Sequence, residues 1–125
     1  MAQANTKSVY QTLADVDCSN HIEKKGKFSY VSWAWAWALV KQNYPDATFE
    51  KHVFTDNTNN VLPFMRDIKG NTYVKTSVTI EGNTLSEVFM VTDNHNNSIK
   101  HPGSQEVNTA LQRCLVKTLA YHGLG

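Results

Sequence analysis

SQEVNTALQRCLVKTLAYHGLG, residues 104–125, is the stretch of the sequence that decides the predicted fold. Its apolar residues recur at intervals of three and four, which is the pattern of one face of an amphipathic α-helix. They are Val107, Ala110, Leu111, Cys114, Leu115, Thr118 (through its methyl group) and Leu119. Ser104 follows the helix breakers Pro102 and Gly103 and is placed to cap the helix, and Gly123 is placed to end it.

The opposite face of this predicted helix is polar. It carries Asn108, Thr109, Gln112, Arg113 and Lys117. Arg113 and Lys117 are four residues apart, so on a helix they project side by side. Two neighbouring cations indicate an anionic partner, and the alternative interpretation is an ordinary solvated face.

Length and composition predict one globular domain over residues 1–125, with residues 1–7 frayed. Hydrophobic residues make up 41% of the chain and charged residues 18%, which argues against a disordered protein. The net charge of +1 points to no partner, although Lys and Arg are in excess at both ends of the chain. Because neither a signal peptide nor a long apolar run is present, we expect a cytoplasmic protein with no membrane partner.

A second helix is predicted in the tryptophan-rich run FSYVSWAWAWALVKQNYP, residues 28–45. The run has no polar/apolar alternation, it is longer than an ordinary strand, and Pro45 stops it after Asn43. Either Ser32 or Ser29 can cap it.

This second helix is apolar nearly all round. Trp33 and Trp37 share one face, and Trp35 lies roughly opposite. Because a helix of this kind needs burial on more than one side, we expect a subunit interface at these tryptophans. The alternatives are a purely core helix and a base-stacking surface.

The rest of the chain predicts an antiparallel β-meander. A short helix is expected over residues 8–16 and a polar loop over residues 17–27. Alternation and β-branched content predict strands over residues 48–54, 61–68, 72–80 and 85–92. The predicted fold class is therefore α+β, with three or four strands and with helices packed on one sheet face.

Three lysines, Lys24, Lys25 and Lys27, surround Gly26 in the predicted loop before the tryptophan-rich run. Such loops are usually solvated, but this one is also a candidate for phosphate contact.

No enzyme constellation stands out in the sequence. There is no glycine-rich phosphate loop and no nucleophile elbow, and the histidines lack the spacing of metal ligands. Cys18 and Cys114 form no zinc pattern, and a disulfide between them is not expected in a cytosolic protein. We therefore expect no catalytic residue, no metal and no cofactor.

Two separated motifs in this order resemble the phage and prophage single-strand annealing proteins of the Sak type, which are placed near the eukaryotic Rad-group annealing mediators. They are SYVSWAWAWALVKQNYPDATFE (residues 29–50) and VNTALQRCLVKTLAYHGLG (residues 107–125), with the strand VKTSVTIEG (residues 74–82) between them. The resemblance implies a β-meander closed by a long helix. It also implies a homo-oligomeric ring or filament that holds single-stranded DNA in a basic groove and anneals it to its complement during phage recombination in the bacterial host, without nucleotide hydrolysis.

By position, Asn108, Arg113 and Lys117 match the polar face of the family motif, and we expect them to bind DNA. Trp33, Trp35 and Trp37 match its aromatic helix, which we expect at the oligomer interface because it is apolar nearly all round. The further candidates for the groove are Lys24, Lys25 and Lys27, together with Arg66 and Lys75 on the sheet. A single-strand-binding protein is a candidate partner.

Two alternative functions remain open from the sequence. One is an oligomeric interaction protein that binds no nucleic acid. The other is a small enzyme with a pocket between sheet and helices.

Overall fold

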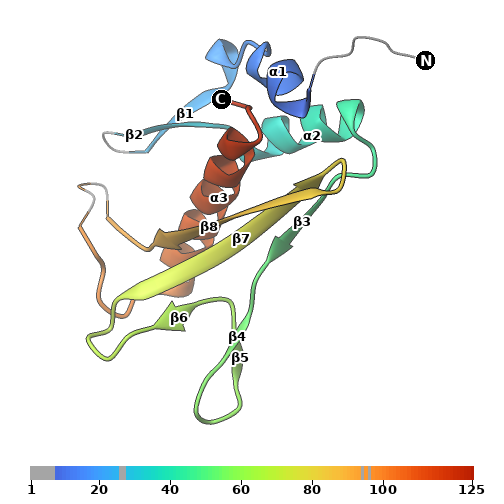
Figure 1. The fold of residues 1–125 in the computed structure, drawn as a ribbon. Coiled ribbons are helices and arrows are strands. Elements are labelled where there is room, and N and C mark those ends of the chain that lie inside the picture. Colours follow the sequence, from blue (N-terminus) through green and yellow to red (C-terminus); the bar gives the residue numbers. More distant parts are fainter. Residues whose placement is uncertain (1–7, 26–27, 94, 96) are drawn as a thin grey trace.

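In a computed structural model, the chain forms an antiparallel sheet that is crossed on one face by the C-terminal helix (Figure 1). The structure describes residues 8–25, 28–93, 95 and 97–125. Residues 1–7, which we expect to fray, and Lys27 lie outside the described residues. The predicted α+β class, with a tryptophan-bearing helix before the meander and a long helix after it, is confirmed.

The centre of the sheet is β7 (Thr72–Ile80). On one edge it pairs along its length with β8 (Asn83–Met90) through a tight turn at Glu81 and Gly82, both of which have positive φ. On its other edge it pairs with two short strands in succession, β3 (Thr48–Lys51) and β6 (Met65–Arg66). The sheet is thus three strands wide, with β3 and β6 sharing one side of β7.

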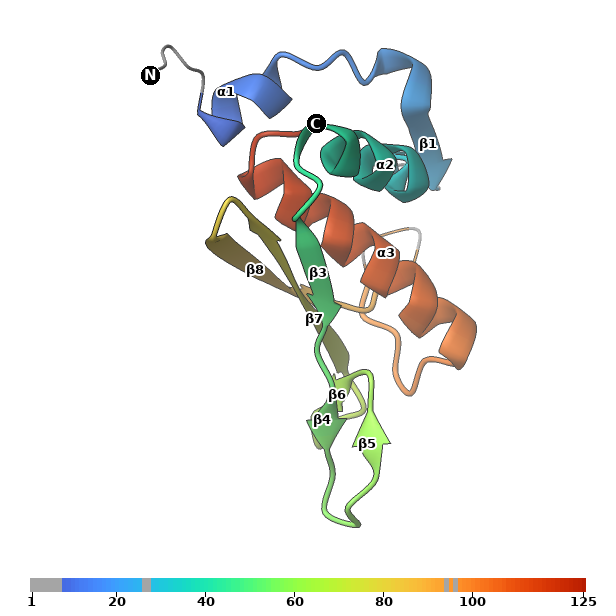
Figure 2. The ribbon, with the colours of Figure 1, turned by 90° about the vertical axis from the view of Figure 1, so that its right-hand side faces the viewer.

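The chain between β3 and β6 leaves the sheet. β4 (Phe54–Thr55) and β5 (Val61–Leu62) pair only with each other, and this hairpin projects beyond the end of the sheet (Figures 1 and 2). The predicted continuous strands over residues 48–54 and 61–68 are therefore wrong. Each is divided into two short strands, because β3 and β6 pair with β7 whereas β4 and β5 pair with each other.

The long helix α3 (Ser104–Tyr121) lies on one face of β7 and β8 (Figure 2). Alternate residues of β7 point under it, and each is 0% exposed: Thr72, Val74, Thr76, Val78 and Ile80. The predicted apolar stripe of the helix is buried against them. This seam contributes to both apolar clusters of the core, as the period of 3.6 in the helix and of 2 in the strand predicts.

The two ends of α3 differ in detail from the prediction. The N-cap is Gly103, not Ser104, and the backbone N–H of Gly103 donates to Glu106 Oε1 at 2.9 Å. Gly123 follows the C-cap with φ +116, as predicted. His122 is 3% exposed and its Nε2 lies 2.9 Å from the Val78 carbonyl oxygen, so it joins the helix end to β7.

The N-terminal third packs at the C-terminal end of α3. A capping box between Ser8 and Gln11 starts α1 (Val9–Ala14). A 3₁₀ turn, η1 (Ser19–His21), leads to a hairpin of β1 (Ile22–Lys25) and β2 (Phe28–Val31). Helix α2 (Trp33–Asn43) follows with Ser32 as its N-cap and packs on α3.

Two predictions in this third are wrong. The predicted loop over residues 17–27 contains η1 and β1, and Phe28–Val31 is a strand, so the helix starts only at Trp33. The sequence of Phe28–Val31 alone did not separate it from the apolar run that follows. Its pairing with β1 through the register from Ile22↔Val31 to Lys25↔Phe28 decides the strand.

Three loops share one five-residue design, with Asp at the first position and Asn at the last. They are residues 56–60, 67–71 and 93–97. In each, the Asp N–H donates to the Asn carbonyl oxygen, at 3.0, 2.9 and 2.8 Å. In each, the Asp Oδ1 accepts from the Asn N–H at 3.0 Å. This arrangement closes each turn through hydrogen bonds within the loop itself.

Hydrogen bonds within these loops favour the ionised form of the aspartate carboxylates. The side-chain hydrogen bond from Thr58 is the main cause that lowers the pKa of Asp56, and the one from Asn71 is the main cause for Asp67.

The two cysteines, Cys18 and Cys114, are free. Burial raises the pKa of both thiols, so both are poor nucleophiles at neutral pH.

Candidate nucleic-acid interface

Arg113 does not lie on an exposed helix face. It is 7% exposed, so the expectation that it projects into solvent beside Lys117 is wrong. The segment after β8 covers this turn of the helix. The Ile99 N–H donates to the Val91 carbonyl oxygen at 3.2 Å, and the Ile99 side chain packs against the apolar cluster that includes Ala110.

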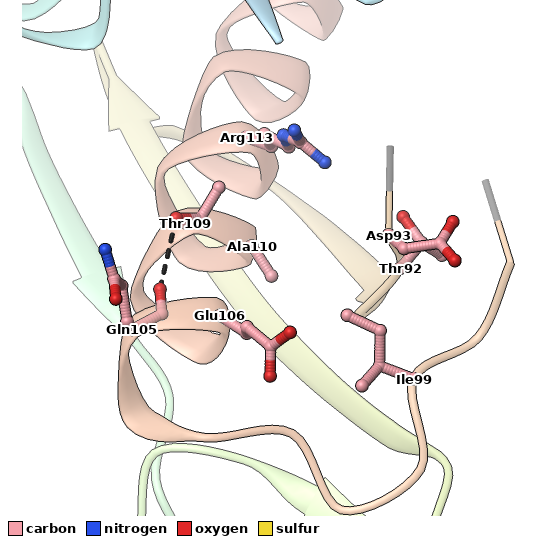
Figure 3. A pocket seen from close by; sticks show the side chains of 8 residues that line it. All are labelled: Thr92, Asp93, Ile99, Gln105, Glu106, Thr109, Ala110 and Arg113. Carbon is pink, nitrogen blue, oxygen red and sulfur yellow. Dashed lines mark hydrogen bonds between the residues drawn. The ribbon is translucent and has the colours of Figure 1, made fainter. Parts of the chain in front are cut away.

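A small pocket of about 290 Å³ lies between that segment and α3, and Arg113 lines it (Figure 3). Its other lining residues are Thr92, Asp93, Ile99, Gln105, Glu106, Thr109 and Ala110. Asp93 and Glu106 bring two carboxylates to the same space as the guanidinium. A cation enclosed in this way is poorly placed to neutralise the phosphates of a passing strand, because acidic groups offset its field.

Lys117 is half-buried on the β8 side of the same helix. Its Nζ lies 5.5 Å from the centroid of the Phe89 ring, within the range of a cation–π contact. Lys117 therefore lies over Phe89, whereas Arg113 lines the pocket beside the segment after β8. The helical spacing had predicted that both would share one exposed face.

Arg66 and Asn108, which are far apart in the sequence, line one pocket. It has a volume of about 390 Å³ and lies between β6 and the first turns of α3. Its lining residues are Pro63, Phe64, Arg66, Pro102, Ser104, Val107, Asn108 and Leu111. The walls are mainly apolar, with one cation, one amide and one hydroxyl among the side chains.

A second pocket of about 590 Å³ lies between β6 and the β4–β5 hairpin. It is lined by Phe54, Thr55, Asp56, Asn57, Leu62, Phe64, Met65 and Arg66. Phe64 and Arg66 line both pockets, so the two are adjacent and are divided by this pair.

The geometry around Arg66 holds its guanidinium in place. Nε donates to Thr72 Oγ1 at 3.0 Å, and Nη2 lies 3.5 Å from the Pro102 carbonyl oxygen. The guanidinium carbon is 4.6 Å from the centroid of the Phe64 ring. The Arg66 side chain is nevertheless exposed, so a fixed cation faces solvent here.

Lys75 belongs to the opposite face of the sheet, which α3 does not cover. On that face a row of hydroxyls crosses the strands. Ser77 Oγ lies 2.7 Å from Ser86 Oγ and 2.6 Å from His52 Nε2. Lys75 therefore cannot share a groove with Arg66 and Asn108 within one copy of the chain.

Of the three lysines in the N-terminal third, Lys24 and Lys25 lie in strand β1, and not in a loop as predicted. Lys27 falls outside the described residues.

The tryptophans of α2 belong to two aromatic groups on different sides of the helix, as the spacing predicted. Trp33 and Trp37 stack with centroids 5.4 Å apart, and the Phe49 ring meets both edge-on, at 5.4 and 5.0 Å. Trp35 stacks on His21 at 4.0 Å. All three indoles are half-buried in the described chain.

Sequence reasoning missed the role of Phe64 and Phe54 at the pockets. The sequence predicts both as strand residues, because no local pattern signals that the β4–β5 hairpin and α3 lie on either side of β6. In the described part of the chain, no group of three or more His, Cys, Asp or Glu side chains could hold a metal ion. No helix among the described residues is long and apolar enough to cross a membrane.

A family model described as Sak single strand annealing protein matches residues 7–125, which is nearly the whole chain. The chain belongs to the Sak family of single-strand annealing proteins. No curated protein and no solved structure gives a significant match.

Membership of the Sak family confirms the expectation of a single-strand annealing protein of phage recombination. The family is not known for hydrolase or transferase activity, which favours strand annealing over the small-enzyme alternative.

Proposed function

We propose that this Sak-family chain binds single-stranded DNA in a basic groove of a homo-oligomer and anneals complementary strands in the cytoplasm of the bacterial host. The observation that carries the proposal is the family match over residues 7–125. Lys and Arg neutralise backbone phosphates and release counterions, which gives affinity without sequence preference. Annealing then requires only that two strands meet with their pairing edges accessible, so no cofactor enters the mechanism.

Among the predicted contact residues, Arg66 and Asn108 support the proposal best. Arg66 is an exposed cation held by two hydrogen-bond acceptors, and Asn108 is exposed on α3 beside the same pocket. Lys117 adds a cation farther along the helix. We assign Arg113 a weaker role than its position in the family motif implies, because it is buried in a pocket that two carboxylates also line.

We propose that the aromatic cluster of Trp33, Trp37 and Phe49 contacts a second copy of the chain. Phe49 is 40% exposed and lies on the edge strand β3, whose pairing partner is β7 on one side only. Exposed aromatic side chains beside an unpaired strand edge favour association. Trp35 is placed on the other side of α2, against His21, and is the weaker candidate.

Binding of a fluorescent oligonucleotide, measured by anisotropy over a salt series, tests DNA binding, and annealing of complementary oligonucleotides without nucleotide tests the activity. We expect affinity to fall as salt rises, with a slope of about 0.7 per phosphate contact for single strands. Light scattering on the same sample reports assembly. A species of only 14.1 kDa would refute the oligomer. Assembly without any binding at low salt would instead favour the oligomeric interaction protein.

A further inference from the structure

We propose that Phe64 and Arg66 form a wedge that separates two consecutive bases of a bound single DNA strand, with one base in each of the two adjacent pockets. The inference rests on the proposed function and adds a base-holding subsite to it. It commits to single-stranded DNA because a duplex keeps its bases stacked and cannot offer them to two separate pockets.

The first step of the argument is the rigidity of the wedge. The Arg66 guanidinium carbon lies over the Phe64 ring, 4.6 Å from its centroid, and Nε and Nη2 donate to Thr72 Oγ1 and to the Pro102 carbonyl oxygen. A guanidinium fixed in a plane can stack on a base and still carry its charge. Little side-chain entropy is lost when a strand binds to such a group.

The second step is the chemistry of the flanking pockets. The pocket on the α3 side, about 390 Å³, has apolar walls that include Val107 and Leu111, and the Asn108 amide at its rim. The pocket on the hairpin side, about 590 Å³, has Phe54 and Leu62 as apolar walls and Asn57 as a polar group. Apolar walls suit the face of any base, and amides can meet the hydrogen-bonding edge of any base, so the subsite is tolerant of sequence.

The third step is the position of charge. None of the residues that line the α3-side pocket is acidic, so the phosphate between the two bases belongs on that side, next to Arg66. Asp56 lines the hairpin-side pocket, but its Oδ1 already accepts hydrogen bonds from the Thr58 N–H at 2.9 Å and the Asn60 N–H at 3.0 Å. The charge pattern thus places the phosphate between the two bases next to Arg66 on the α3 side, with one base on each side of the wedge.

Four single variants test the wedge by oligonucleotide anisotropy. Phe64→Leu keeps apolar bulk but removes the aromatic face, and Phe64→Tyr keeps that face. Arg66→Ala removes both the stacking plane and the charge. Lys69→Ala is the matched control, because it removes one exposed positive charge close to β6 without touching either pocket.

We expect Phe64→Leu to weaken binding by roughly 5- to 100-fold with an unchanged salt slope, since base stacking carries no counterion release. Arg66→Ala should weaken binding and reduce the slope by about 0.7. Phe64→Tyr should bind as the parent does, and Lys69→Ala should change affinity less than Arg66→Ala.

A second probe, an oligonucleotide of abasic sugar-phosphate units, separates base contacts from phosphate contacts. When the abasic probe replaces the ordinary oligonucleotide, the affinity of the parent should fall by a larger factor than the affinity of Phe64→Leu. The variant has already lost the stacking surface, so it has less base contact to lose. If the parent binds DNA and Phe64→Leu matches it on both probes, the wedge is refuted while the annealing function stands. If the parent binds no single strand at low salt, the proposed function fails and the wedge fails with it.

Discussion

Replacing Thr76 and Thr118 by valine, singly and together, tests the hydroxyl pair that joins β7 to α3. Both side chains are 0% exposed, and their Oγ1 atoms are 2.8 Å apart. The Thr118 hydroxyl donates to the Cys114 carbonyl oxygen at 2.8 Å, so the hydrogen between the two threonines comes from Thr76. Valine keeps the shape of threonine, and the substitutions therefore remove hydrogen bonds without opening a cavity.

The expected loss of unfolding free energy depends on which buried hydroxyl is left without a hydrogen-bond partner. Thr76→Val removes one neutral hydrogen bond and should cost about 1 kcal/mol of unfolding free energy. Thr118→Val leaves the buried Thr76 hydroxyl with only the Cys114 sulfur, 3.2 Å away, as its acceptor, and should cost about 1–2 kcal/mol. The double variant leaves neither hydroxyl behind, so it should cost less than the sum of the singles by about 1 kcal/mol.

Urea unfolding monitored by tryptophan fluorescence measures all four proteins in one double-mutant cycle. The control cycle is Thr79→Val and Thr84→Val, whose hydroxyls are 2.6 Å apart on the uncovered sheet face. Water can replace either partner there, so those changes should stay within about 0.5 kcal/mol. If the Thr76 and Thr118 costs simply add, the hydroxyl pair does not couple the helix to the sheet and the reasoning is refuted.

Two further predictions concern the loops. The lowered pKa values of Asp56 and Asp67 mean that their contribution to stability is present above their ordinary value of 3.8 and is lost as pH falls through the lower folded values. A variant with both changed to Asn should therefore lose less stability than the parent between pH 5 and pH 2 in urea unfolding, and equal losses would contradict the assignment. Gly70→Ala should destabilise by more than about 1 kcal/mol, because φ is +88 and a Cβ would lie 2.7 Å from His101 Nε2. Gly82 has φ +77 and a Cβ there would meet nothing within 4 Å, so Gly82→Ala should lower the stability less than Gly70→Ala does. Thermal melts of both variants measure the difference, and a larger loss for Gly82→Ala would rule out the clash at Gly70.

The sequence alone determined the elements whose signal is local. The three-and-four spacing of Val107 to Leu119 identified α3, and the alternation in residues 72–80 identified β7 as its partner. The opposite placement of Trp35 relative to Trp33 and Trp37 followed from helical geometry. These features need only the backbone period and the polarity of each residue, so no knowledge of distant segments was required. The family resemblance also came from such local motifs.

Tertiary structure alone decided which side chains share a surface. Arg113 has the spacing of an exposed residue, yet it is buried and lines the pocket between α3 and the segment after β8, and nothing within α3 signals that burial. Arg66 and Asn108 line one pocket because β6 pairs with β7 directly beside the start of α3. The division of the expected strands into β3 and β4, and into β5 and β6, depends on which segments pair with β7 and which pair with each other. Burial and proximity are properties of what packs against a residue, and that partner is set by the whole fold and not by the residue's own neighbours in sequence.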